Sequence, residues 1–475
     1  MKKLIAFLLA IVMVLALAAC AAQKAEQPAV SDAAAEPAAD QNQTQEDAAA
    51  SETPATQDEP VELEVWVCAD SLEPQDTNND GVVEYGMGTE FSEYAARFME
   101  THPNVTINVI PIGANADEYN SKFSMAAAAD NLPDIVYTAA GWIKEWAPAG
   151  VITDLSGMVD EIAPNFKTDA IEVANAAVDG TWCIPMKAET QGWFYNTKIL
   201  AEHGLEVPET FEEFLNVCKV LTEDGTLAIA HGATDVWAVW GYYSLFCQNG
   251  VDKELCEKLS SGEEDFFTCE PFRKTLEEIK QIADTGAYGE NCAYMSNNEA
   301  RSLFLNGDAA MYGNGSFSIN DFASSDIAND VVFSFGPQFA DKVYEGTVGM
   351  RVYGWSLLCG SRVGKSEAKL AAVKDLFKFI TSEEGGAIAF KSGTIPAADP
   401  TAAAASSGGT TVETSIFEAL ASEDVYTVPD MCQEWFDASI KVPFRTAVTA
   451  VLSGTATIDQ AMQLLADWQS SYVAQ

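Results

Sequence analysis

Strand-like and helix-like patterns of hydrophobic residues take turns along the chain from position 61 onwards. Residues 61–67 and 105–109 alternate apolar with polar or aromatic positions, as a half-buried strand does. Between them, apolar side chains over 91–98 recur at helical spacing, and a second helix is expected over 119–129, before a short strand over 134–137. Strands that alternate with helices predict parallel strands joined by crossover helices, which is an α/β fold.

Two later helices have start signals in the sequence. Thr210 with Glu213, and Thr457 with Gln460, have the spacing of a capping box, in which two side chains satisfy backbone N–H groups at the helix start. The apolar residues over 370–380 lie on one side of a predicted amphipathic helix. We therefore expect helices at these three places in the second half of the chain.

The first twenty residues have the layout of an export signal. Lys2 and Lys3 precede an apolar run over 4–17, which ends in small residues before Cys20 and is short for a membrane span. A Cys after Leu-Ala-Ala also resembles the lipobox of bacterial lipoproteins. That resemblance implies that Cys20 becomes the lipid-modified first residue of the mature protein, anchored to the cell membrane on its extracytoplasmic face. The alternative is an ordinary signal peptide or an N-terminal membrane helix.

Residues 21–60 contain no aromatic residue and consist largely of Ala, Gln, Glu, Asp, Ser, Thr and Pro. Such a segment buries too little apolar surface to offset its chain entropy, so it is predicted to be a disordered acidic and Ala-rich linker. No later stretch approaches eighteen consecutive apolar residues, so we expect contact with the membrane only through the lipid anchor.

The charge of the chain excludes one class of partner. Its 475 residues include 71 acidic and 26 basic side chains, which gives a net charge of −45. Such a surface repels phosphate backbones, so nucleic acid is not expected as a partner. A hydrophobic content of 48% is enough for two packed domains in a chain of this length.

Nine cysteines follow Cys20, and none of them forms a CxxC pair. A structural zinc site therefore has no support. An odd number leaves at least one thiol unpaired, and the sequence does not say which of the others form disulfides.

Five segments spread over positions 63–468 match a known family in order and spacing. They are a His-Pro turn over 98–105, Asn-Leu-Pro-Asp-Ile-Val-Tyr over 131–137, a segment with Gly-Thr-Trp and Phe-Tyr-Asn over 180–196, a Gly-rich turn over 305–317 and the closing helices over 444–461. In this combination the chain resembles the extracellular solute-binding proteins of ABC importers, family 1, whose sugar-binding branch is typified by maltose-binding protein.

The resemblance implies a type II periplasmic-binding-protein-like fold, with two α/β lobes joined by crossing hinge segments and a ligand cleft between them. Lobe 1 is expected to comprise 61–187 and 355–400, and lobe 2 to comprise 188–354 and 401–475. In this family the lobes close on the solute, and the transmembrane subunits of an ABC permease recognise the closed form. The implied function is capture and delivery of a carbohydrate, in particular an oligosaccharide, by a monomer that is not an enzyme.

A sugar presents apolar C–H faces and a rim of hydroxyl groups, so its site needs aromatic platforms and hydrogen-bond acceptors. By the resemblance, Asp70 and Glu189 match ligand carboxylates of the type protein. Asp235 and Trp237 match an acid-and-aromatic pair, and Phe317 stands where the type protein stacks a Trp on the sugar. Further candidate platforms are Trp142, Trp355 and Trp435.

Each of these residues also has a structural interpretation. Asp70 could be a turn residue, Glu189 could form a hinge ion pair, and the aromatic rings could be core. The sequence departs from the type protein at Phe317, which follows Ser rather than Pro, and at Lys441, which stands at the last stacking position. The resemblance therefore does not imply a specificity for maltodextrins.

One loop has the start of a calcium-binding sequence. Asp76, Asn78 and Asp80 place oxygen ligands at alternate positions before Gly81. Position twelve is Met87 instead of the usual Glu, and an Asn-, Asp- and Gly-rich turn is the alternative. Ca²⁺ is thus a candidate ligand of this loop, and no other cofactor is required.

Two alternative functions remain at this point. An exported carbohydrate-active enzyme would also need acidic and aromatic residues, but the chain has only three His and no G-x-S-x-G or metal-ligand signature. The same fold could instead bind a polyamine or a metal, and the adjacent Tyr242 and Tyr243 are similar to a feature of ferric-iron binders.

Overall fold

The computed structural model describes residues 59–75, 86–113, 116–235, 238–401, 408–422 and 424–474. By its internal contacts the chain divides into two units, Met1–Pro54 and Ala55–Gln475, and all of the described residues belong to the second. The predicted signal segment and nearly all of the predicted linker lie outside the described residues and stay predictions.

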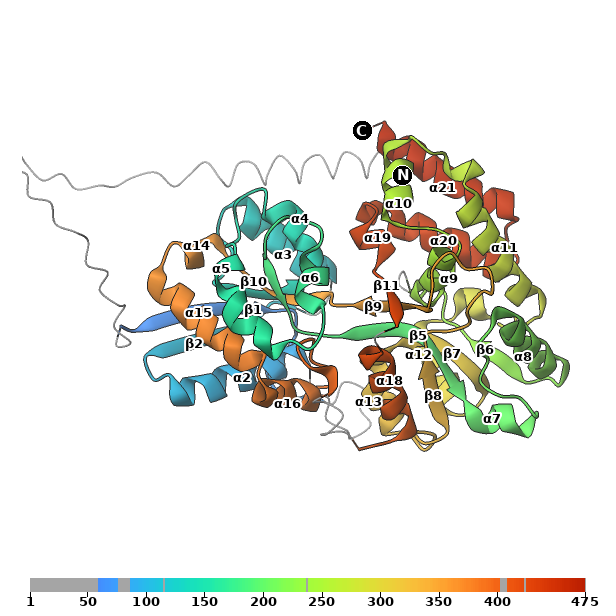
Figure 1. Ribbon diagram of the computed structural model, residues 1–475, viewed down its shortest axis with the longest axis horizontal. Helices are drawn as coiled ribbons and strands as arrows, with labels where there is room; N and C mark the ends of the chain where they lie inside the picture. The colour runs from blue at the N-terminus through green and yellow to red at the C-terminus, as the bar shows by residue number, and fades with distance from the viewer. Residues whose placement is uncertain are drawn as a thin grey trace, which may run out of the picture. The chain divides into compact units, whose positions relative to one another are not determined.

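The described unit contains two β-sheets (Figure 1). The first has the strand order β2-β1-β3-β10-β4, with β1 (Val61–Val67), β2 (Val105–Pro111), β3 (Ile135–Ala139), β4 (Cys183–Pro185) and β10 (Trp355–Cys359). The second has the order β11-β9-β5-β7-β6, with β8 paired to β5, and consists of β5 (Glu189–Asn196), β6 (Leu227–Ala230), β7 (Ala309–Gly315), β8 (Val331–Ser334), β9 (Thr347–Val352) and β11 (Val425–Val428).

Helices accompany both sheets. With the first sheet are α2 (Met87–Thr101), α3 (Ala116–Ala128), α4 (Ile143–Trp146), α5 (Ser156–Ile162), α6 (Ala170–Asn175), α14 (Ser361–Gly364), α15 (Glu367–Ile380) and α16 (Glu383–Lys391). With the second are α7 (Thr197–Glu202), α8 (Phe211–Glu223), α9 (Tyr243–Gln248), α10 (Lys253–Ser261), α11 (Glu270–Asp284), α12 (Asn297–Leu305), α13 (Ile319–Ala323), α18 (Thr411–Ala421), α19 (Met431–Glu434), α20 (Lys441–Leu452) and α21 (Ile458–Val473).

The strand periodicity of the sequence corresponds to two packed faces of the first sheet. Tyr137 on β3 packs in the cluster that contains Phe91 of α2, whereas its neighbour Val136 packs in the cluster that contains Phe123 of α3 and Trp146 of α4. Successive side chains of a strand point to opposite faces, so helices cover both sides of β3. The predicted α/β fold is confirmed.

The strands that the sequence pattern identified are parallel, as predicted: β1 pairs in parallel with β2 and with β3. β10 instead runs antiparallel to β3 and β4. It comes from much later in the chain and is not joined to its neighbours by a crossover helix, so local alternation gave no information about its direction. The first sheet is therefore mixed.

The predicted helix starts are also confirmed. The Thr210 side chain accepts from the Glu213 N–H while the Glu213 carboxylate accepts from the Thr210 N–H, and Thr457 and Gln460 form the same reciprocal pair at α21. The amphipathic segment over 370–380 lies in α15, with its apolar side buried.

Three segments that connect strands of the two sheets, or run beside those connections, are joined by backbone hydrogen bonds. Met186, between β4 and β5, donates its N–H to the Trp355 carbonyl at 2.8 Å and accepts from the Ala397 N–H at 3.0 Å. Ala188 donates to the Ile395 carbonyl at 2.8 Å. We call residues 186–188, 353–355 and 395–397 the crossing segments. The predicted lobe boundaries near them stay a prediction.

Within the described part of the chain, none of the helices has the length and apolar content needed to cross a membrane. All nine cysteines after Cys20 are described and buried, and none of them forms a disulfide.

A buried carboxylate ties the first sheet to its covering helices. Asp134, which is 1% exposed, accepts from Arg362 Nε of α14 at 2.9 Å, from Lys369 Nζ of α15 at 2.8 Å and from the Glu64 backbone N–H of β1 at 2.9 Å. This one side chain thereby fixes where α14 and α15 start relative to β1.

We expect Asp134→Asn to lower the free energy of unfolding by about 1.5–3 kcal/mol, because it removes the buried carboxylate that accepts charge-assisted hydrogen bonds from Arg362 and Lys369. Urea denaturation followed by circular dichroism measures the change. The control is Asp284→Asn, which removes an exposed pair with Lys280 and should cost less than about 0.5 kcal/mol. Similar losses in the two variants would contradict the structural role of Asp134.

Candidate functional site

Trp355, the first residue of β10, is a half-buried aromatic ring beside the crossing segments. Its ring centroid lies 6.4 Å from that of Tyr119 and 6.3 Å from that of Tyr137, both at steep angles. The ammonium group of Lys187 lies 5.8 Å from the centre of the Trp355 ring, at cation–π distance. The tyrosines hold the ring in place and leave part of it accessible.

Glu189, the first residue of β5, stands two positions after Lys187 and is half-buried. Burial raises the pKa of its carboxyl group, and the positive charge of Lys187 lowers the same pKa. Residues two apart on an extended segment face the same side. The crossing segments therefore bring an aromatic ring, an ammonium group and a carboxyl group close together.

A second carboxyl group, that of Glu90, lies near these residues. Glu90 is fully buried in the first turn of α2, where it accepts from Thr394 Oγ1 at 2.9 Å and from the Tyr94 hydroxyl at 3.2 Å. Burial raises its pKa, and the charge of Lys187 acts in the opposite direction. Sequence reasoning did not single out Glu90 or Lys187 for this site; an acidic residue among the apolar positions of the first helix was the available signal for Glu90.

Trp142 and Trp435 lie on segments that approach each other. Trp142 ends the 3₁₀ helix η1 (Ala140–Trp142) and stacks on buried Trp146, with centroids 4.7 Å apart. Lys144, two residues later, donates to the backbone carbonyl of Glu434 at 2.6 Å, directly before half-buried Trp435. A cavity of about 60 Å³ lies here, lined among others by Gly141, Lys144, Tyr353 and Glu434.

The remaining predicted residues follow the carboxyl ends of strands. Asp70 comes after β1 and Trp142 after β3, which are parallel neighbours, so both residues lie at one edge of the first sheet. Asp235 and Phe317 likewise follow β6 and β7, parallel neighbours of the second sheet. Asp70 is exposed, and Phe317, in η6 (Ser316–Ser318), is 39% exposed.

Asp235 has a structural contact of its own. Its Oδ2 accepts from the Asn297 backbone N–H at 2.8 Å, at the start of α12. Trp237 lies outside the described residues, so the predicted pairing of Asp235 with Trp237 stays a prediction.

The candidate calcium residues Asp76, Asn78 and Asp80 also lie outside the described residues, and the calcium prediction stays open. In the part of the chain that the structure does describe, no group of three or more His, Cys, Asp or Glu side chains is arranged to hold a metal ion.

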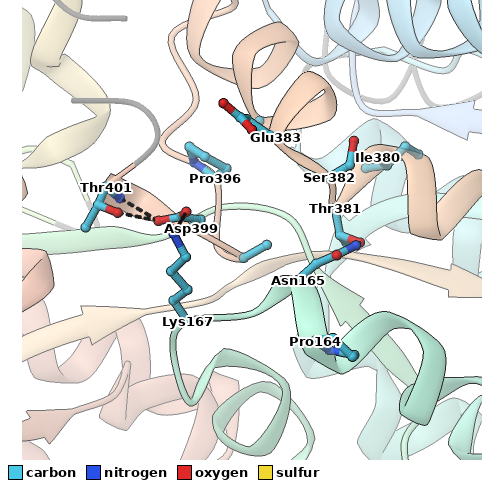
Figure 2. A pocket seen from close by; sticks show the side chains of 12 residues that line it. Pro164, Asn165, Lys167, Ile380, Thr381, Ser382, Glu383, Pro396, Asp399 and Thr401 are labelled. Atoms are coloured by element: carbon cyan, nitrogen blue, oxygen red, sulfur yellow. Dashed lines mark hydrogen bonds and ion pairs between the residues drawn. The ribbon is translucent and has the colours of Figure 1, made fainter. Parts of the chain in front are cut away.

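A larger polar cavity, of about 470 Å³, contains none of the predicted residues. Figure 2 shows its lining, in which the Lys167 ammonium pairs with the Asp399 carboxylate at 2.5 Å and Thr401 donates to the same carboxylate. Asn165 donates to Thr381 Oγ1 at 2.9 Å. Its main polar groups thus have protein partners and no aromatic ring lines it, so we do not assign the solute site here.

Comparisons with known proteins identify the class of protein to which this chain belongs. A profile of the bacterial extracellular solute-binding protein family matches residues 85–387, and the chain belongs to this family. It is an extracytoplasmic binding protein and not an enzyme, as predicted.

Among curated proteins, the chain is 24% identical over 203 residues to the multiple sugar-binding protein of Streptococcus mutans serotype c (strain ATCC 700610 / UA159), an alignment that covers 40% of this chain and 46% of that one. It is 24% identical over 136 residues to the putative ABC transporter periplasmic-binding protein YcjN of Escherichia coli (strain K12), covering 28% and 31% of the two chains. These alignments span less than half of each relative.

Among solved structures, a chitin oligosaccharide binding protein aligns with a TM-score of 0.68 and 19% identity, over 88% of this chain and 100% of the other. RafE from Streptococcus pneumoniae, without ligand, aligns with a TM-score of 0.66 and 18% identity, over 89% and 100%. Similarity to structures at this level of sequence identity shows the fold alone. The fold is the predicted two-lobe fold of maltose-binding protein.

The carboxyl group of Glu434 makes the stability of the folded protein depend on pH. Burial, with a contribution from nearby Asp430, raises the pKa of its carboxyl group to about 7, while Lys144 acts against the rise. The folded protein therefore holds this proton more tightly than an unfolded chain, whose Glu has a pKa of 4.5. The contribution of Glu434 to stability falls as the pH rises from about 4.5 to about 7.

We expect Glu434→Gln, which cannot ionise, to raise the melting temperature relative to the unmodified protein more at pH 8 than at pH 5. Differential scanning fluorimetry of both proteins at four pH values between 5 and 8 measures the difference. A difference that stays constant across this range would show that Glu434 does not titrate there.

Proposed function

We propose that this protein captures a carbohydrate, in particular an oligosaccharide, outside the cytoplasm and delivers it to the transmembrane subunits of an ABC permease. The observation that carries the proposal is the half-buried Trp355 ring beside Glu189 at the crossing segments. An aromatic face next to a carboxyl group is suited to the apolar face and hydroxyl rim of a sugar.

The printed names of similar proteins support the same class of solute. The Streptococcus mutans relative is named a multiple sugar-binding protein, and one of the similar structures is RafE in complex with raffinose. The ligand would be held between the lobes by residues that remain proposals for this role: Asp70, Trp142, Glu189, Asp235, Trp237, Phe317, Trp355 and Trp435. Closure of the two lobes on the solute would give the permease its signal, and the protein would act as a monomer.

The ferric-iron alternative is disfavoured by the structure. Tyr242 and Tyr243 are each 1% exposed and pack in the core of the second sheet, where the Tyr242 hydroxyl donates to the Tyr288 hydroxyl at 2.8 Å. Burial raises the pKa of both tyrosines above the ordinary value. These side chains are placed for packing rather than for iron ligation.

We expect Glu189→Gln to weaken binding of the solute about tenfold to a hundredfold, the usual worth of a hydrogen bond to a charged group, and to leave the melting temperature of the empty protein unchanged. A thermal-shift screen of mono- and oligosaccharides finds the solute, and isothermal titration calorimetry measures its affinity. A ligand at a hundred times its dissociation constant stabilises the folded state by about 2.7 kcal/mol.

The control for this variant is Glu290→Gln, an exposed carboxylate remote in sequence from the crossing segments. Loss of stability in empty Glu189→Gln would assign Glu189 a structural role. Conversion of a bound saccharide during incubation would contradict the proposal as a whole.

We further propose that Cys20 is lipid-modified and that residues 21–60 hold the folded part away from the membrane. The support is the sequence layout alone, a charged start, an apolar run and small residues before Cys20. Cys20→Ser should move the protein from the membrane fraction to the medium or soluble fraction, measured by detergent phase partitioning and immunoblotting. Equal membrane retention of both proteins would favour an N-terminal membrane helix instead.

A further inference from the structure

Lys187 differs from those lysines of the protein whose ammonium groups bind an oxygen atom. Lys369 ends on the Asp134 carboxylate, Lys144 on the Glu434 carbonyl and Lys122 on the Ile112 carbonyl. Within the described residues, Lys187 Nζ has no hydrogen bond or ion pair; it lies 5.8 Å from the centre of the Trp355 ring, and its charge also acts on the carboxyl groups of Glu90 and Glu189.

This lack of an oxygen partner within hydrogen-bond distance is informative because Lys187 is half-buried. Taking a charge out of water is unfavourable unless an opposite charge or a hydrogen bond compensates for it. The chain has 71 acidic against 26 basic side chains, so carboxylates are abundant. The ammonium group of Lys187 nevertheless lies over the half-buried Trp355 ring and not on a carboxylate.

The two nearest carboxyl groups do not replace the missing partner. Glu90 is engaged by Thr394 and Tyr94, and neither Glu90 nor Glu189 lies within ion-pair distance of Lys187. Burial raises the pKa of both carboxyl groups and the charge of Lys187 lowers it, so these groups interact with Lys187 through space without a direct bond.

We propose that the solute is an acidic saccharide whose carboxylate, that of a uronic acid residue, binds the Lys187 ammonium while a sugar ring lies on Trp355. This inference rests on the proposed carbohydrate function and narrows its solute class. The carboxylate supplies the missing opposite charge through a charge-assisted hydrogen bond, which is stronger than a bond to a neutral hydroxyl. Glu189, on the same side of the segment, is then left to bind hydroxyl groups.

The test compares acidic oligosaccharides with neutral forms of the same molecules. The probes are oligouronides of defined length, among them trigalacturonate and glucuronic-acid-branched xylotetraose, and the same compounds after chemical reduction of each carboxyl group to an alcohol. Isothermal titration calorimetry with the purified full chain gives the affinity for both members of each pair. For a pair that binds, we expect the acidic member to bind about tenfold to a hundredfold more tightly.

Three variants show whether Lys187 causes this preference. Lys187→Met keeps an unbranched apolar side chain and should abolish the preference, whereas Lys187→Arg keeps the charge and should retain it. Lys198→Met, at an exposed position of α7, is the matched control and should bind both members as the unmodified protein does. Unchanged melting temperatures of the empty variants show that the fold is intact.

The outcomes separate this inference from the proposed function. Neutral members that bind as tightly as the acidic ones, or a preference that survives Lys187→Met, would overturn the acidic solute and leave carbohydrate binding standing. Equal weakening of both members by Lys187→Met would also overturn it, because Lys187 would then serve Glu189 or the fold. Binding of no saccharide, acidic or neutral, in this panel and in the thermal-shift screen would refute both proposals.

Discussion

The backbone hydrogen bonds among the crossing segments are the constraint on which the candidate site depends. Met186 bonds to Trp355 and Ala397, and Ala188 bonds to Ile395, so three stretches of chain that are distant in sequence are held side by side. Main-chain bonds of this kind fix position whatever the side chains are. Because the segments are locked, Lys187 of one and Trp355 of another are held close together, and Glu189, which directly follows the first segment, lies near Lys187.

At the crossing segments, charged side chains, which are costly to bury, lie next to an aromatic ring, which packs well. The first sheet is closed on both faces by helices, and its buried carboxylate Asp134 is paired with Arg362 and Lys369. Beside the crossing segments, Lys187 lies at the Trp355 ring with no direct bond to Glu90 or Glu189, and burial raises the pKa of both carboxyl groups. Polar groups that the fold does not satisfy are available to a solute.

Local patterns in the sequence predicted local structure well. The strand over 61–67, the capping boxes at Thr210 and Thr457 and the helix over 370–380 depend on residues a few positions apart. The antiparallel β10 depends on a pairing across most of the chain, which no local pattern contains. Lys187 could not be recognised for the same reason: what distinguishes it is that its ammonium group lies at the Trp355 ring with no direct hydrogen bond or ion pair, which only the folded chain determines.

The nine buried thiols have a consequence for the life of the protein outside the cytoplasm. Burial raises the pKa of Cys183 and Cys68 to about 12, and every other cysteine after Cys20 also has a raised pKa. Only the thiolate reacts readily with oxidants, so the native state is chemically protected without a single cross-link. The vulnerable interval is the time before folding is complete, when the thiols are exposed and can be oxidised or form disulfides that the native state lacks.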